Sequence, residues 1–179
     1  MDIQEEYRKR NKSRHVTLFG EIGELFRYLD DRASNKELHK LFREGGRPVD
    51  ETRIQLILGA LFDAFFYDRR TEIVREASIG NGKVDFLFHR ADDPEEKVLI
   101  EVKRASSISY LKHGFEKQLV SYLLSSRYRH AFYLIACFTD EEYERIRRFI
   151  SENIYTDEVQ VYVNIRVLDL RERPTASAL

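Results

Sequence analysis

Two acidic residues, each beside or inside an apolar run, most constrain what this 179-residue chain can fold into. Asp85 lies within one such run, and Glu101 directly follows another. Short apolar runs bounded by polar turns are typical of buried strands. Alternation along a strand places Glu101 and Lys103 on one face, with Val102 on the other. If the two strands pair, one sheet face carries two carboxylates and an ammonium close together.

This concentration of charge within a sheet is costly unless the carboxylates are neutralised. A divalent cation does so, because Mg²⁺ prefers oxygen ligands such as carboxylates and carbonyls. The pattern therefore indicates a metal-dependent phosphodiesterase site. The alternative is an exposed strand edge, since Glu-x-Lys is frequent in a chain that is 34% charged. A second copy, Glu95-Glu96-Lys97, has the surroundings of a solvated turn.

Three motifs in chain order resemble the PD-(D/E)xK nuclease superfamily. They are Gly82-x-x-Asp85, Glu101-x-Lys103 and Gln118-x-x-x-Tyr122. The third motif is similar to that of the RecB-type branch, which includes lambda exonuclease and the CRISPR adaptation nucleases. The likeness covers about residues 50 to 138.

The chain departs from the superfamily pattern in two places. Val84 stands where a proline is expected before the aspartate. The single cysteine, Cys137, excludes the four-cysteine iron–sulfur cluster that some RecB-type members carry.

The resemblance implies a nuclease that needs Mg²⁺ or Mn²⁺ and hydrolyses nucleic acid, with DNA as the expected substrate. Its role would lie in repair, mobile elements or defence. Asp85, Glu101 and the backbone carbonyl of Val102 would hold the metal. Lys103 would hold the attacking water, and Gln118 would orient the substrate or that water.

Further residues are expected at the edges of this site. Tyr122 would stack on a base or bond a phosphate, and Lys112 would line the substrate groove. By resemblance, an acid on the preceding helix joins the metal site, and Glu51 or Glu76 could supply it. The competing interpretation of Glu51 is an acid that favours the first turn of a helix through the macrodipole.

The N-terminal third predicts helices. Apolar spacing predicts one helix over residues 18–29. Ser34 and Glu37 form a capping-box pattern for a second short helix, which Gly45-Gly46 would stop. Asp50 can cap a third, aromatic-rich helix.

The rest of the chain predicts an α/β restriction-endonuclease-like core, with a mixed central sheet flanked by helices and an N-terminal helical extension. The expected strands cover residues 71–79, 84–89, 97–103, 130–138 and 159–170, with helices at about 110–125 and from 139 onward.

These elements predict three segments. Residues 1–49 would form a basic arm and helical extension, residues 50–170 the nuclease-like domain, and residues 171–179 a flexible tail. The basic residues within 1–15 suit either phosphate binding or a frayed terminus.

Composition limits the functional classes. The net charge of −1 gives no global basic field, so nucleic-acid binding must use local patches. One cysteine argues against a disulfide framework, and no run reaches the ~20 apolar residues of a membrane span. A cytoplasmic protein is expected, either alone or as a homodimer or part of a larger complex. The alternative function is a non-catalytic nucleic-acid-binding or assembly module that keeps the nuclease fold.

Overall fold

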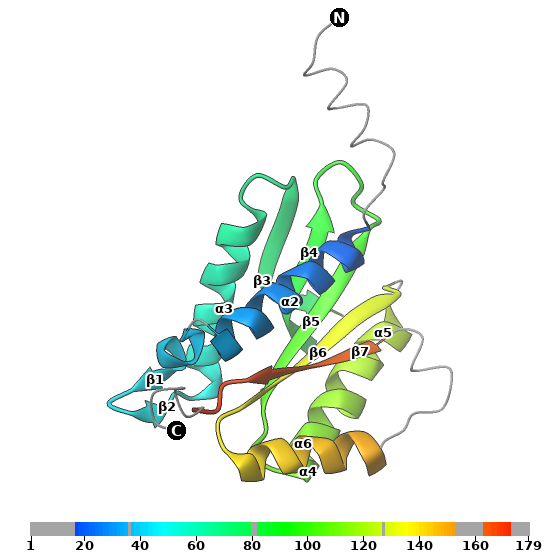
Figure 1. The fold of residues 1–179 in the computed structure, drawn as a ribbon. Helices are drawn as coiled ribbons and strands as arrows, with labels where there is room; N and C mark the ends of the chain where they lie inside the picture. The colour runs from blue at the N-terminus through cyan, green and yellow to red at the C-terminus, as the bar shows by residue number, and fades with distance from the viewer. Residues whose placement is uncertain (1–16, 36, 80–81, 127, 153–162, 173–179) are drawn as a thin grey trace, which may run out of the picture.

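The computed structural model describes residues 17–35, 37–79, 82–126, 128–152 and 163–172. A five-stranded sheet in the order β3-β4-β5-β6-β7 lies at its centre, with helices packed on both faces (Figure 1). The predicted basic arm and most of the predicted tail lie outside the described residues. No helix in the described part of the chain is long and apolar enough to cross a membrane.

The strands are β1 (Arg43–Glu44), β2 (Arg47–Pro48), β3 (Thr71–Ile79), β4 (Gly82–Arg90), β5 (Lys97–Arg104), β6 (His130–Cys137) and β7 (Val163–Asp169). The helices are α2 (Leu18–Asn35), the 3₁₀ turn η1 (Leu38–Phe42), α3 (Glu51–Phe66), α4 (Ile108–Lys112), the π-helical η2 (His113–Val120), α5 (Ser121–Ser125) and α6 (Asp140–Glu152).

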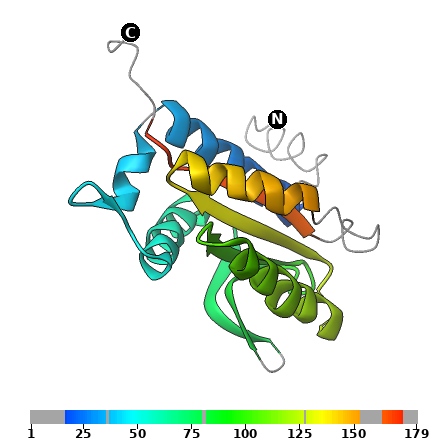
Figure 2. The ribbon, with the colours of Figure 1, turned by 90° about the horizontal axis from the view of Figure 1, so that it is seen from below.

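The sheet is mixed. Strands β3, β4 and β5 form an antiparallel meander, and β5, β6 and β7 run parallel. The segment α4–η2–α5 makes the crossover between β5 and β6. Figure 2 shows that β3 and β4 extend away from α2 and α6. The predicted fold class, an α/β core with a mixed central sheet flanked by helices and an N-terminal helix, is confirmed.

The predicted second short helix is present as η1, but its predicted start at Ser34 is wrong. Helix α2 continues to Asn35, so Ser34 lies in its last turn instead of starting a new helix. The extension follows from Ala33, which is buried and continues the apolar stripe of α2. After η1 the chain turns through a hairpin whose two central residues, Gly45 and Gly46, have φ of 56° and 77°. Two positive φ angles in succession favour glycine at both positions.

Helix α3 begins where the sequence predicts. The Asp50 side chain accepts a 2.8 Å hydrogen bond from the backbone N–H of Arg53, as an N-cap does. The helix packs its aromatic residues on the sheet, and the Phe62 ring lies 5.0 Å from Phe86 and 5.5 Å from Phe88. These edge-on contacts fix α3 over β4.

The two sheet faces carry separate cores. One core is covered by α2 and α3 and the other by the crossover helices and α6. Strand β5 contributes to both, since Val98, Ile100 and Val102 belong to the first core and Leu99 to the second. Alternation therefore directs Glu101 and Lys103 toward the crossover helices.

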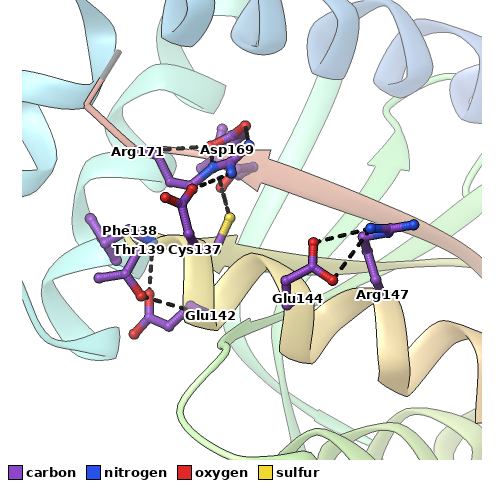
Figure 3. A network of polar contacts seen from close by, with 10 residues as sticks. Cys137, Phe138, Thr139, Glu142, Glu144, Arg147, Asp169 and Arg171 are labelled. Atoms are coloured by element: carbon purple, nitrogen blue, oxygen red, sulfur yellow. Dashed lines mark hydrogen bonds and ion pairs between the residues drawn. The ribbon is translucent and has the colours of Figure 1, made fainter. Parts of the chain in front are cut away.

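Helix α6 is tied to the ends of the parallel strands by polar contacts (Figure 3). The Glu142 N–H donates to the Thr139 hydroxyl, which confirms the predicted cap, and the Glu142 carboxylate accepts from the Phe138 N–H at 2.7 Å. The same carboxylate pairs with Arg104, the last residue of β5. The end of β5 is thus held against α6.

Candidate active site

Asp85 lies where β4 separates from β5. The paired register of these strands ends at Phe86 and Ile100. One residue further, Oδ2 of Asp85 accepts a 2.7 Å hydrogen bond from the N–H of Val102. The carboxylate thus takes a backbone donor that a continuing ladder would have used. This interruption brings Asp85 between the two strands.

Glu101 and Lys103 lie together on β5, beneath the crossover helix. Nζ of Lys103 is 2.8 Å from Oε1 of Glu101, and the two residues are 5% and 1% exposed. The helix comes this close because residue 114 is glycine: a Cβ there would lie 2.8 Å from both Cε of Lys103 and the Tyr133 hydroxyl. Gly114 belongs to the π-helical segment η2, and π-helical turns are frequent at functional sites.

Burial and mutual repulsion perturb the acids. Burial, followed by the nearby Asp85, raises the pKa of Glu101 to about 7. Burial also raises the pKa of Asp85, against the opposing effects of Lys103 and the Val102 N–H. Burial alone would lower the pKa of Lys103, but Glu101, Asp85 and Glu51 outweigh it and raise that pKa. The acids around Lys103 therefore outnumber its ammonium, and burial disfavours the charged forms of Glu101 and Asp85.

The residues fit a hard cation. Oε2 of Glu101 is buried and has no hydrogen-bond partner within the described residues, an arrangement that costs free energy. In a strand, the N–H and the C=O of one residue point to the same neighbouring strand. The Val102 N–H donates to Asp85 of β4, so the carbonyl of Val102 also points toward β4. Two carboxylates and a carbonyl are oxygen ligands suited to Mg²⁺.

The described residues contain no group of three His, Cys, Asp or Glu side chains arranged to hold a metal ion by themselves. Any cation at this site would therefore depend on backbone oxygen and water besides Asp85 and Glu101. Mg²⁺ commonly keeps several of its waters in protein sites.

Glu51, one of the two expected additional acids, lies beside the cluster. Its Oε1 accepts hydrogen bonds from Lys103 Nζ at 3.2 Å and from the Tyr110 hydroxyl at 2.8 Å. Its Oε2 accepts from the Arg104 N–H at 2.9 Å. Both oxygens of Glu51 are thus engaged by protein donors.

The other expected acid, Glu76, lies opposite Asp85 in the register, at a step where β3 and β4 do not pair. Its backbone has a φ of 47°, which is strained for a residue with a side chain. Its carboxylate is exposed and lies 3.4 Å from the ammonium of Lys83.

Two residues at the site were not predicted from the sequence. Nε2 of Gln55 donates to Oδ1 of Asp85 at 2.9 Å, and Tyr110 contacts Glu51 as described above. A signal existed for Gln55, because it follows Glu51 by four residues and so shares its helix face. Tyr110 carries no such signal, since its position depends on how α4 leaves β5.

The three predicted substrate residues differ in their position relative to the acid cluster. Tyr122 packs over Gly82, where any Cβ would collide with its ring, and burial followed by Glu101 raises its pKa. Gln118 is half-buried in η2, and no hydrogen bond between described residues joins it to the acids. Lys112 lies 3.7 Å from Glu152 of α6. The structure thus brings Tyr122 near the cluster, and the roles of all three residues stay predictions.

Comparison with known proteins gives one family and two structures. Residues 18–140, more than half of the chain, match the family described as "Domain of unknown function (DUF8371)". A comparison with curated proteins finds no match.

Two solved structures are similar to the chain. One is Pyrococcus furiosus SfsA in complex with Ca²⁺, at 17% identity and a TM-score of 0.40, covering 67% of this chain and 58% of that one. The other is a repair endonuclease from Pyrococcus abyssi, at 13% identity and a TM-score of 0.30, covering 69% of this chain and 49% of that one. The chain thus spans less than two thirds of either protein.

Proposed function

This chain belongs to the DUF8371 family, and we propose that it is a divalent-metal-dependent nuclease that hydrolyses phosphodiester bonds, with DNA as the expected substrate. One observation carries the proposal. Asp85 from β4 and Glu101 and Lys103 from β5 converge, and a buried oxygen of Glu101 has no hydrogen-bond partner among the described residues. A structural ion pair alone would not need the two further carboxylates, those of Asp85 and Glu51, that act on the same ammonium.

Each residue has a proposed role. Asp85, Glu101 and the Val102 carbonyl would hold the cation, and Gln55 would fix the Asp85 carboxylate through Oδ1. Mg²⁺ or Mn²⁺ supplies a lowered pKa for bound water and neutralises charge on the phosphate. Lys103 would hold the attacking water with the one N–H donor left beside those that face Glu101 and Glu51, and its charge would help to polarise the scissile phosphate.

The substrate would contact the side of the cluster where Tyr122 and Gln118 lie. Tyr122 offers an aromatic face for a base or a hydroxyl for a phosphate. Gln118 would orient the substrate or the attacking water, and Lys112 would attract the phosphate backbone after leaving Glu152. A homodimer or larger complex would supply further contacts.

A cleavage assay tests the proposal. Purified protein is incubated with linear, nicked and circular DNA and with RNA, in Mg²⁺, Mn²⁺ or EDTA. We expect cation-dependent cleavage that Glu101→Gln lowers by at least about 10²-fold. Glu95→Gln is the matched control, because Glu95 belongs to the second Glu-x-Lys copy, in the exposed loop after β4. Equal activity of wild type and Glu101→Gln would place the chemistry elsewhere.

Cation binding supplies an independent test. A ligand that binds only the folded state raises the unfolding temperature. We expect Mn²⁺ to raise it for the wild type and for Glu95→Gln, but not for Asp85→Asn. Thermal unfolding followed by circular dichroism measures this without any substrate.

One observation favours the second candidate, a binding or assembly module without catalysis. Glu101 and Lys103 are almost fully buried, so a phosphate reaches them only if the crossover helix yields or the cation extends the site outward. The N-terminal helix does not cause this burial, because α2 covers the opposite face of the sheet. Nucleic-acid binding that is equally tight in EDTA, without cleavage in any cation, would support the module.

A further inference from the structure

Tyr110 is an aromatic residue at the exposed margin of the acid cluster. It lies in the first turn of α4, where its backbone N–H donates to the hydroxyl of Ser107, the N-cap residue. The cap sets the direction in which α4 leaves β5, and that direction carries the tyrosine ring back over the end of the strand. The residue is 39% exposed, so solvent reaches one side of the ring.

The hydroxyl and the ring of Tyr110 contact two different partners. The hydroxyl donates to Oε1 of Glu51 at 2.8 Å, and the ring centroid lies 5.6 Å from Nζ of Lys103. Burial, followed by this hydrogen bond to Glu51, raises the pKa of Tyr110 to about 12. Tyr110 is thus a hydrogen-bond donor to the acid and a cation–π partner of the amine.

Glu51 Oε1 receives a second donor from the same cluster. Nζ of Lys103 lies 3.2 Å from it and 2.8 Å from Oε1 of Glu101. A lysine side chain has a flexible four-carbon stem, so the position of its ammonium depends on what surrounds it. Here an acid on each side and a ring fix that position, and Tyr110 holds one of the acids as well as covering the amine.

We propose that Tyr110 is a positioning residue, which acts through Glu51 to keep the Lys103 ammonium beside Glu101. This inference rests on the proposed nuclease function for its kinetic consequence only. Tyr110 contributes no atom to the reaction, and removing its hydroxyl leaves Glu51 Oε1 with Lys103 as its one remaining donor among the contacts described above. The ammonium then samples more orientations, and a misplaced group near the reacting atoms costs rate.

A double-mutant cycle tests the route through Glu51. We expect Tyr110→Phe to lower kcat about tenfold with an unchanged KM, because one hydrogen bond to a charged group is lost. Glu51→Gln should have a comparable or larger effect, and the double variant should be no slower than Glu51→Gln alone. Tyr28→Phe is the matched control, since Tyr28 is a similarly exposed tyrosine on α2 with a cation–π contact to Arg32.

Two kinetic outcomes would overturn the inference. A raised KM with unchanged kcat for Tyr110→Phe would mean that the tyrosine binds substrate directly. Fully additive losses in the double variant would mean that Tyr110 and Glu51 act separately. Thermal unfolding of each variant shows whether a lost activity reflects lost folding.

A second measurement does not need cleavage. In metal-free protein, the Lys103 amine is acylated with a small reagent and the extent is read by peptide mass spectrometry. We expect Tyr110→Phe and Glu51→Gln to raise labelling of Lys103 severalfold and to leave labelling of Lys97 unchanged. If labelling of Lys103 increases in these variants but the wild type cleaves no substrate, the positioning role is supported and the nuclease proposal is refuted. If labelling of Lys103 is unchanged in the variants, the positioning role is refuted whatever the cleavage assay gives.

Discussion

The two faces of the central sheet have different contents although the same strands build both. The face under α2 and α3 is a continuous aromatic core, in which Phe26, Phe62 and Phe132 are almost fully buried. The face under the crossover helix is also apolar, but it encloses the carboxylate of Glu101 and the ammonium of Lys103. The face under α2 and α3 thus mainly supplies stability, and the face under the crossover helix gives up part of its stability to hold charge.

Removal of an aromatic residue from the first face should have the largest effect. Phe62 is fully buried and contacts Phe26, Phe86 and Phe88, so Phe62→Ala should lower the free energy of unfolding by about 3–5 kcal/mol. Urea unfolding measures this. Phe65→Ala, at a half-buried position of the same helix, should cost clearly less. Equal losses at both positions would contradict the idea that the depth of burial in this core sets the cost.

Breaking the buried ion pair should have the next largest effect. Lys103→Met leaves Glu101 with no ammonium beside it and should destabilise the fold by about 3 kcal/mol. The double variant Glu101→Met/Lys103→Met should recover most of that loss, because the desolvation penalty of the acid disappears with its charge.

The matched control for the buried pair is Lys83→Met. Lys83 also pairs with a glutamate, Glu76, but both side chains are exposed. We expect a loss below about 1 kcal/mol, as for most exposed pairs. Urea unfolding of all three variants gives the comparison, and a double variant less stable than Lys103→Met would refute the explanation.

The strained backbone at Glu76 allows a smaller test beside Asp85. Glu76→Gly should raise the free energy of unfolding by about 1 kcal/mol, because glycine accepts the φ of 47° without strain. Arg70→Gly, at a φ of 51° in the turn before β3, should act similarly. Cation binding should be unchanged in Glu76→Gly, and weaker binding would instead assign Glu76 to the metal site.

The smallest effect is expected at Cys137. Burial, followed by the nearby Asp169, raises the pKa of its thiol to about 12, and the residue is fully buried. Only the thiolate reacts with alkylating reagents. Native protein at pH 8 should therefore resist alkylation, with labelling that appears only in denaturant. Rapid labelling of the folded protein would show that the core between the sheet and the crossover helices opens readily to solvent.

Much of the fold follows from local sequence patterns. The cap at Asp50, the meander and the crossover are predicted, because each depends on neighbouring residues or on alternation. The capping-box pattern at Ser34 misleads, since it carries no information about Ala33, whose burial extends α2 past it. A local pattern is overridden when a preceding helix still has an apolar side to bury.

The candidate site is predictable in its centre only. Alternation places Glu101 and Lys103 together, and strand order brings Asp85 to them. The degree of burial is not predictable, because it depends on Gly114 letting the crossover helix approach Lys103. The position of the Tyr110 side chain likewise depends on the angle at which α4 leaves β5, and the spacing of residues in the sequence does not determine that angle.

The hydrogen bond between the Val102 N–H and Asp85 turns one main-chain amide into a reporter of the carboxylate. Its NMR frequency should respond to whatever draws Asp85 away, whether an added ion or a substitution. The NMR frequencies of β5 amides that bond only to other strands should not change. A titration of isotope-labelled protein would thus follow events at the split between the strands without any nucleic acid present.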